Sequence, residues 1–241
     1  NLAAEAEFTM EEVDDYMRER IRDVVEWANT PLVRHAAREA AQQAEDLGLL
    51  VLAVEQAEEQ MAQTRALSED EELVGYLQGL VAREPAFGEV FITEAHGFNV
   101  AYSSQPSDFV QAGEVWWDTA WETGSYVGEV LYDSSAGVYS VEIVVRIDDL
   151  DGTPVGVVTT VLDVKALQER ADEMAARIRG GSVHLFTASG DQVADTTSKH
   201  DPELIMSAED DIGLRLCANA LRQLIPAVPD RKEGEAGAKA G

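Results

Sequence analysis

Aromatic side chains are the residues of this sequence best suited to chemistry, and they gather in one stretch. Nine of the 16 Phe, Tyr and Trp residues fall between Phe98 and Tyr139. Three of the four Trp lie within six residues, at Trp116, Trp117 and Trp121. Trp and Tyr offer a broad apolar face with one polar group, which suits a pocket that encloses a small molecule and still presents hydrogen bonds. The stretch therefore predicts a ligand pocket; the alternative is that the three Trp side chains fill a core beneath a short helix.

A short helix is expected from Trp116 to Glu122, and it separates the indoles. Trp117 and Trp121 are one helical turn apart and share a face, whereas Trp116 points elsewhere. One indole can then pack on a sheet while the other borders a cavity. Glu114, just before the helix, is placed to hold an ammonium group beside Trp116 and Trp117 through charge and cation–π contact. Alternatively, Glu114 is a solvated residue that the helix dipole favours at this position.

Four further candidates, Tyr126, Tyr132, Asp133 and Tyr139, lie on a pair of predicted strands that would wall the pocket. Tyr132 and Asp133 are neighbours in a strand, so only one of them can point into the cavity. Asp133 also suits a turn, given its Asp-Ser-Ser setting. No catalytic residue is expected, because neither Cys217 nor any of the four His has a nucleophile-and-base spacing. No metal-ligand cluster has zinc spacing either, and we expect no cofactor.

The elements that position these residues begin with helices over residues 1–84. Apolar residues recur at three- and four-residue steps from Met10 to Ala28, which places one stripe along a long helix. This stripe also predicts pairing with a second copy, as a homodimer through the N-terminal helix. A second helix is expected from Leu32 through Met61, and a third opens after Ser68 and ends before Pro85.

From Glu89 the hydrophobic period changes from helical to alternating, which predicts a β-rich module. Strands are expected at 90–93, 98–102, 127–132, 138–147 and 155–162, followed by an exit helix over 164–178. A shorter strand-turn-strand pattern from residue 182, with a helix near 210–224, predicts a partial second module. The chain thus divides into a helical region (1–84), a sheet with its exit helix (85–180), a partial membrane-proximal module (181–230) and a flexible tail (231–241).

Composition and charge exclude several classes of protein. With 45% apolar residues the chain can bury a core, so disorder is excluded. The formal net charge of -28 makes nucleic acid an unfavourable partner, because like charges repel at every contact. No apolar run is long enough to cross a membrane, so we expect any membrane anchor to lie outside this chain.

Three stretches, residues 109–120, 124–139 and 144–158, resemble the Cache (PAS-like) extracytoplasmic sensor domains of bacterial and archaeal receptors. The resemblance covers roughly residues 9–180. It implies an α+β fold, in which a five-stranded antiparallel PAS-like sheet is joined to a long N-terminal helix. It also implies a ligand cavity on the membrane-distal side of that sheet.

Within this resemblance, the ligand-binding positions match only in part. Amino-acid-sensing members carry an aromatic residue, an Arg and a Trp-aromatic pair at positions that correspond here to Phe109, Glu114, Trp116 and Trp117. The Arg that would clamp a carboxylate is therefore replaced by Glu114. An Asp that holds the ligand's ammonium group is replaced by Val161. We therefore expect a cationic or neutral small molecule, and not an α-amino acid held in that way.

These observations predict the extracytoplasmic ligand-sensing domain of a transmembrane receptor of the histidine kinase, chemoreceptor or diguanylate cyclase type, without catalysis of its own. Three alternatives stay open. The chain could be a soluble periplasmic binding module, an enzyme that uses the aromatic pocket, or a ligand-free dimerisation domain.

Overall fold

The computed structural model describes residues 2–133, 138–163, 165–177, 183–186 and 192–196. The helix expected near 210–224 and the tail over 231–241 lie outside the described residues.

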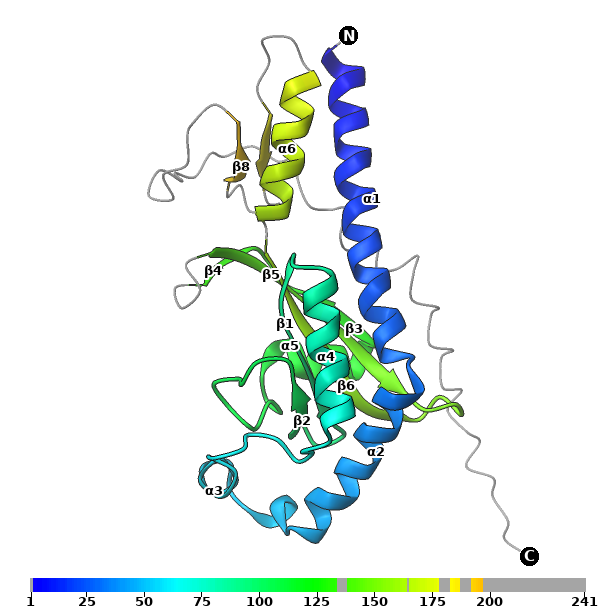
Figure 1. Ribbon diagram of the computed structural model, residues 1–241, viewed down its shortest axis with the longest axis vertical. Coiled ribbons are helices and arrows are strands. Elements are labelled where there is room, and N and C mark those ends of the chain that lie inside the picture. Colours follow the sequence, from blue (N-terminus) through cyan, green and yellow to red (C-terminus); the bar gives the residue numbers. More distant parts are fainter. Residues whose placement is uncertain (1, 134–137, 164, 178–182, 187–191, 197–241) are drawn as a thin grey trace, which may run out of the picture.

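An antiparallel sheet forms the centre of the fold (Figure 1). Its strand order is β2-β1-β6-β5-β3, and a further short strand, β4, also pairs with β5. The strands are β1 (Phe87–Glu94), β2 (Asn99–Tyr102), β3 (Ser125–Val127), β4 (Leu131–Asp133), β5 (Val138–Asp148) and β6 (Pro154–Asp163). The α+β fold with an antiparallel sheet is thereby confirmed.

The prediction of one strand over 127–132 is wrong, because the structure has two short strands there, β3 and β4. Both short strands pair with β5, and the residues between them begin with Gly128. Gly128 still donates its backbone N–H to the Glu142 carbonyl at 2.8 Å. From Val127 to Leu131 the chain advances four residues while its partner β5 advances three, from Ile143 to Ser140, so one extra residue interrupts the ladder as a bulge does.

Helices make up most of the remainder. They are α1 (Leu2–Ala28), α2 (Pro31–Asp46), α3 (Val54–Gln60), α4 (Glu71–Arg83), α5 (Val115–Thr123) and α6 (Lys165–Arg177), with a short 3-10 helix, η1 (Leu49–Val51). The single second helix expected from Leu32 through Met61 is wrong, because the structure ends α2 at Asp46. Gly48 follows with φ of 69°, a left-handed conformation that stops a helix and that glycine adopts without strain.

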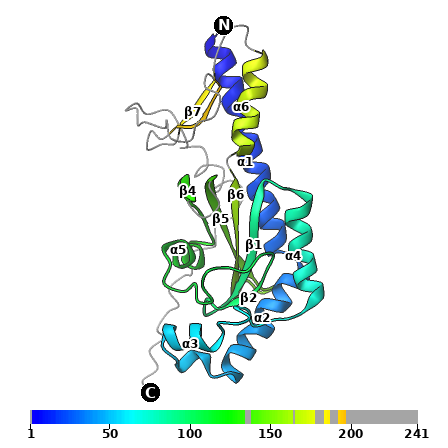
Figure 2. The ribbon, with the colours of Figure 1, turned by 60° about the vertical axis from the view of Figure 1, so that its left-hand side comes forward.

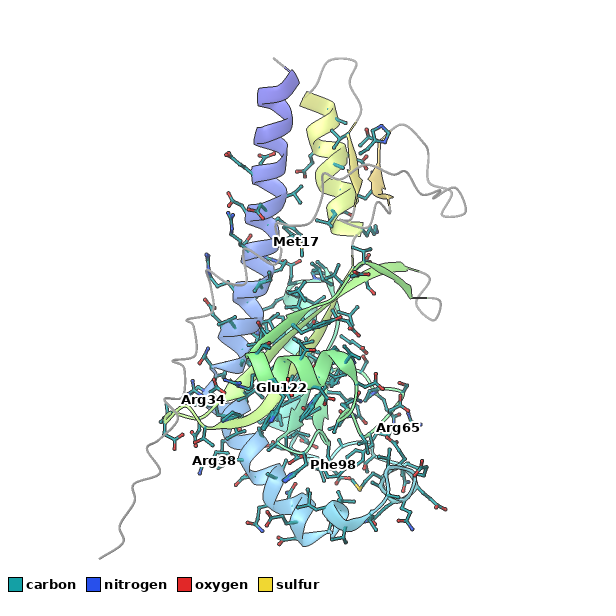
Figure 3. The ribbon with its side chains drawn as sticks, turned by 180° about the vertical axis from the view of Figure 1, so that it is seen from behind. Met17, Arg34, Arg38, Arg65, Phe98 and Glu122 are labelled. Atoms are coloured by element: carbon teal, nitrogen blue, oxygen red, sulfur yellow. The ribbon has the colours of Figure 1, made fainter. Side chains whose placement is uncertain are left out.

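Different helices cover the two faces of the sheet. Helices α1, α2 and α4 pack on one face, whereas α5 lies on the other, which we call the outer face (Figure 2). Alternating strand residues explain the division: Ile92, Ile143 and Val158 point into the core shared with the helices. Arg34 and Arg38 of α2 also hold the β5–β6 turn, through the Asp148 carbonyl at 2.9 Å and the Asp149 carboxylate at 3.2 Å (Figure 3).

The first helix is long, as expected, and its apolar stripe is buried inside this chain. Val13, Met17, Ile21, Val24 and Ala28 are each at most 6% exposed. Because these side chains already have partners, the stripe no longer calls for a second copy, and homodimerisation stays a prediction.

The N-terminal half of α1 extends beyond the sheet and runs beside α6 (Figures 1 and 2). The expected second strand-turn-strand unit is present as β7 (His184–Phe186) and β8 (Gln192–Asp195), an antiparallel pair in contact with α6. Within the part of the chain described, no helix combines the length and the hydropathy of a membrane span.

Candidate functional site

A hollow lies on the outer face of the sheet. Its volume of about 750 Å³ falls within the roughly 300–1,000 Å³ of small-molecule sites. Strands β1, β5 and β6 supply its floor, the start of α5 supplies one wall, and the loop 103–114, which we call the rim loop, supplies the edge.

The floor of the hollow consists of alternate residues of three adjacent strands. Phe91 lies opposite Thr159 in the register, and Glu89 lies opposite Val161. On its other side, Val161 lies opposite Glu142. Successive strand residues point to opposite faces, so these five side chains share the outer face while their neighbours pack on the helices. The floor therefore combines two carboxylates, an aromatic ring and a hydroxyl group.

Thr159 is the buried polar residue of this floor. It is 2% exposed, and its hydroxyl group has no hydrogen-bond partner among the described residues. The next residue, Thr160, donates its hydroxyl group to the carbonyl of Glu89 at 2.6 Å. Burying a hydroxyl without a partner costs about 1–3 kcal/mol, so an occupant of the hollow that bonds Thr159 would recover this cost.

The rim loop is fixed by side chains from outside it. Glu58 of α3 accepts hydrogen bonds from the backbone N–H groups of Phe109 and Val110, both at 2.7 Å. Arg65, whose side chain is labelled in Figure 3, donates to the carbonyl of Pro106 at 2.9 Å. These bonds hold the edge of the hollow against the body of the protein.

The neighbouring indoles of α5 point to different sides, as the helical spacing predicted. Trp116 lines the hollow and meets Phe91 edge-on, with ring centroids 6.0 Å apart and planes at 83°. Trp117 is 6% exposed, stacks on Trp121 at 5.3 Å, and donates its indole N–H to the hydroxyl of Thr93 at 2.8 Å. Trp117 therefore supports the wall from within the core, because protein groups already occupy its N–H and a ring face.

Glu114 occupies a position that is compatible with both alternatives, and its contact with a ligand stays a prediction. It occupies the N-cap position of α5 and it lines the hollow. Its side chain makes no capping hydrogen bond; Asp118 instead accepts one from the backbone N–H of Gly113 at 3.1 Å. The carboxylate of Glu114 is thus available at the edge of the site.

The electrostatic field of the hollow is negative. Burial raises the pKa of Glu142 above its ordinary value, and repulsion from Glu114 and Glu89 raises it further. The pKa of Tyr126 is also raised, first by burial and then by the charges of Glu142 and Glu129. Five carboxylates line the hollow, and its described lining contains no Lys, Arg or His. A cation entering here would relieve this repulsion.

Two other predicted contacts lie outside the lining. Phe109 is fully buried and stacks on Phe98 at 5.3 Å, beneath the rim loop. Tyr126 packs against the cluster around Trp117 and Val144. Both residues support the site rather than face the hollow.

The remaining three candidates belong to the paired strands β4 and β5. Tyr132 lies opposite Tyr139 in the register, and Asp133 lies opposite Val138 at the last described pair. Their role as ligand contacts stays a prediction.

Sequence reasoning did not identify the floor residues Glu89, Phe91, Glu142 and Thr159. A signal for two of them was present. Glu142 lies between the apolar residues Val141 and Ile143, and Thr159 follows the apolar pair Val157 and Val158. A polar residue at such a position must find a partner or face a site.

The carboxylates are spread around the hollow. Over the described residues, no group of three or more His, Cys, Asp and Glu could hold a metal ion. The arrangement instead suits an organic molecule that places positive charge or hydrogen-bond donors near the carboxylates and an apolar surface against Phe91 and Trp116.

Comparison with known proteins found similar solved structures. No model of a known protein family matches the sequence, and no curated protein matches it. The ligand-binding domain of the Pseudomonas fluorescens chemoreceptor CtaA, in complex with L-alanine, is 17% identical with a TM-score of 0.44, over 81% of this chain and 71% of that one. The domain of the Campylobacter jejuni chemoreceptor Tlp3, in complex with L-valine, is 16% identical with a TM-score of 0.42, over 86% and 77%. The extracellular domain of a protein assigned as a histidine kinase is 15% identical with a TM-score of 0.44, over 89% and 80%.

Proposed function

We propose that this chain is the extracytoplasmic ligand-sensing region of a transmembrane signal receptor and that the hollow is its ligand site. The receptor is of the histidine kinase, chemoreceptor or diguanylate cyclase type, anchored by segments outside this chain. The ligand is a small molecule, cationic or neutral, and the chain has no catalysis of its own. The observation that carries the proposal is the hollow of about 750 Å³, which has the unpartnered hydroxyl of Thr159 in its floor.

The route from ligand to signal runs through the sheet. Glu142 and Thr159 face the hollow, while their strand neighbours Ile143 and Val158 pack in the core that includes α1. A ligand that draws the floor residues together shifts these neighbours against the helices. Binding then favours whichever arrangement of sheet and helices has the higher ligand affinity.

The direction of output follows from the placement of two helices. The N-terminal half of α1 and α6 run side by side at the same end of the molecule, away from the rim loop (Figure 1). A displacement of the sheet against α1 would change the relation between these two helices, which is how the proposed receptor passes its signal to flanking segments.

A ligand-free dimerisation domain is the second candidate, and the packing around Trp117 favours it. Trp117 is buried against Trp121 and Thr93, as a purely structural aromatic cluster would be. The hollow on the side of Trp116 favours the sensor, because a spacer element has no need of an open site with an unpartnered buried hydroxyl.

A thermal-shift screen of small cations, neutral polar molecules and amino acids tests the proposed sensor. A ligand at about 100 times its dissociation constant stabilises the folded chain by roughly 2.7 kcal/mol. Two tryptophans of α5 supply a matched pair: Trp116→Ala should abolish the shift, because Trp116 lines the hollow, whereas Trp121→Ala should preserve it. A hit that both variants keep, or no hit in any class, would count against the sensor.

A further inference from the structure

The hydrogen-bonding groups of the hollow point to one chemical class of ligand, and this inference rests on the function proposed above. The five lining carboxylates belong to Glu89, Asp108, Glu114, Glu142 and Asp163. They come from β1, β5, the end of β6 and two places on the rim loop. Ionised carboxylates accept hydrogen bonds and cannot donate them.

Two polar side chains of the rim loop add to this acceptor character, because each already donates a hydrogen bond within the protein. Gln111 donates its side-chain amide to the carbonyl of Asp108 at 2.9 Å, and Ser107 donates its hydroxyl to the carboxylate of Asp108 at 2.7 Å. The Ser107 hydroxyl then offers only oxygen lone pairs to the hollow, and the Gln111 amide offers its oxygen and one remaining N–H. The lining therefore selects a molecule that brings its own donors.

Thr159 gives an independent indication that the floor is built for an occupant. Its hydroxyl is buried in the wall of the hollow without a partner, between the strands that carry Glu89 and Glu142. A primary ammonium group has three donors and no acceptor, so it can bond a carboxylate and this hydroxyl at once. A quaternary ammonium has no N–H and would leave Thr159 unpaired.

The positions of the carboxylates indicate whether the ligand carries one positive charge or several. Glu142 lies close enough to Glu114 and Glu89 for their charges to act on it. Asp108 and Asp163 lie on other parts of the lining, and no three acidic residues among those described converge as they would around a metal ion. Carboxylates at separate places around one hollow match ammonium groups at separate places along one aliphatic chain.

We propose that the hollow binds an aliphatic amine with two or more primary ammonium groups. One ammonium group bonds Glu142 and Thr159, and a second lies towards Asp108 or Asp163. The methylene chain between them packs on Phe91 and Trp116. This assignment agrees with Glu114 at the edge of the site, where an ammonium group and an indole face are both in reach.

Isothermal titration calorimetry with four probes at physiological ionic strength tests the assignment. The probes are putrescine, the mono-amine butylamine, the neutral butanediol and the dicarboxylate succinate. Putrescine should bind at least about tenfold more tightly than butylamine, and the other two should not bind, since each hydrogen bond to a charged group is worth about a tenfold change or more.

Variants distinguish a built site from general attraction to a chain of net charge -28. Glu142→Gln should weaken putrescine binding at least about tenfold, and Glu114→Gln, at an exposed position that folding tolerates, should weaken it in the same direction. Glu69→Gln removes the same charge from an exposed residue outside the lining and should leave the affinity unchanged.

Each contrary result has a defined meaning. If Glu69→Gln lowers the affinity for putrescine as much as Glu142→Gln does, putrescine binds only as a counter-ion, without a specific site. If butanediol or succinate binds more tightly than putrescine, the amine assignment is overturned but the hollow is still a ligand site. If putrescine fails to bind, the amine assignment is overturned. The sensor proposal fails with it only when the wider thermal-shift screen also gives no ligand that depends on Trp116.

Discussion

Replacing Thr159 by valine should stabilise the ligand-free protein and lower its affinity for the ligand. Valine keeps the branched shape of threonine and is well suited to a strand, so the exchange removes the hydroxyl with little change of volume. Because that hydroxyl is buried without a partner, its burial costs about 1–3 kcal/mol that valine does not incur. We expect the free energy of unfolding to rise by about 1 kcal/mol, which moves the melting temperature by roughly 2–4 °C in a chain of this size.

The same exchange should weaken the binding of putrescine. A hydrogen bond from an ammonium group is worth about 1.5–3 kcal/mol, which corresponds to roughly a tenfold to hundredfold rise in the dissociation constant. The neighbouring Thr160 is the matched control. Its hydroxyl already bonds the Glu89 carbonyl at 2.6 Å. Thr160→Val should therefore destabilise the protein by about 1 kcal/mol without altering the affinity for putrescine.

Urea unfolding and calorimetry of the two variants decide the matter. The reasoning is refuted if Thr159→Val loses stability as Thr160→Val does, because the hydroxyl would then have a structural partner. It is also refuted if Thr159→Val gains stability and binds putrescine with unchanged affinity, because the hydroxyl would then not contact the ligand.

Three further predictions concern the surroundings of the hollow. Burial and repulsion from Glu114 and Glu89 raise the pKa of Glu142 in the folded state, so its contribution to stability is present at low pH and is lost as the pH rises through that raised pKa. Glu142→Gln should remove this part of the fall in the free energy of unfolding with rising pH. Urea unfolding of the wild type and the variant from pH 4 upwards measures the effect, and parallel plots of stability against pH would contradict it. Glu58→Ala leaves two rim-loop N–H groups without their acceptor, and should cost about 1–3 kcal/mol and speed hydrogen exchange at those amides, whereas unchanged exchange would show that the rim is held by other bonds. Gly156→Ala would place a methyl group against a carbonyl oxygen of β1 and should destabilise the fold by about 1–3 kcal/mol in thermal unfolding, whereas a neutral result would show that the strands yield there.

The order of elements was predictable because each element has a local pattern. The helical stripe and the alternation from Glu89 onward both depend on neighbours in the sequence. The structure contains the alternating strands, and it buries the stripe from Val13 to Ala28. The different directions of Trp116 and Trp117 were predictable for the same reason, since helical spacing fixes them.

The floor of the site was not predictable from local pattern. Alternation shows that Glu89 and Phe91 share a face, but the register that brings Glu142 and Thr159 beside them depends on which strands are neighbours in the sheet. Clustered aromatic residues also served two purposes that spacing alone does not separate. Phe109 supports the rim from the core, whereas Trp116 faces the hollow.

A crystal structure of the chain grown with putrescine tests the central claim most directly. We expect density for the diamine in the hollow, with one nitrogen within hydrogen-bond distance of both the Glu142 carboxylate and the Thr159 hydroxyl, and with its methylene chain against Trp116. A hollow closed by its own side chains, or one that stays empty at saturating putrescine, would contradict the account.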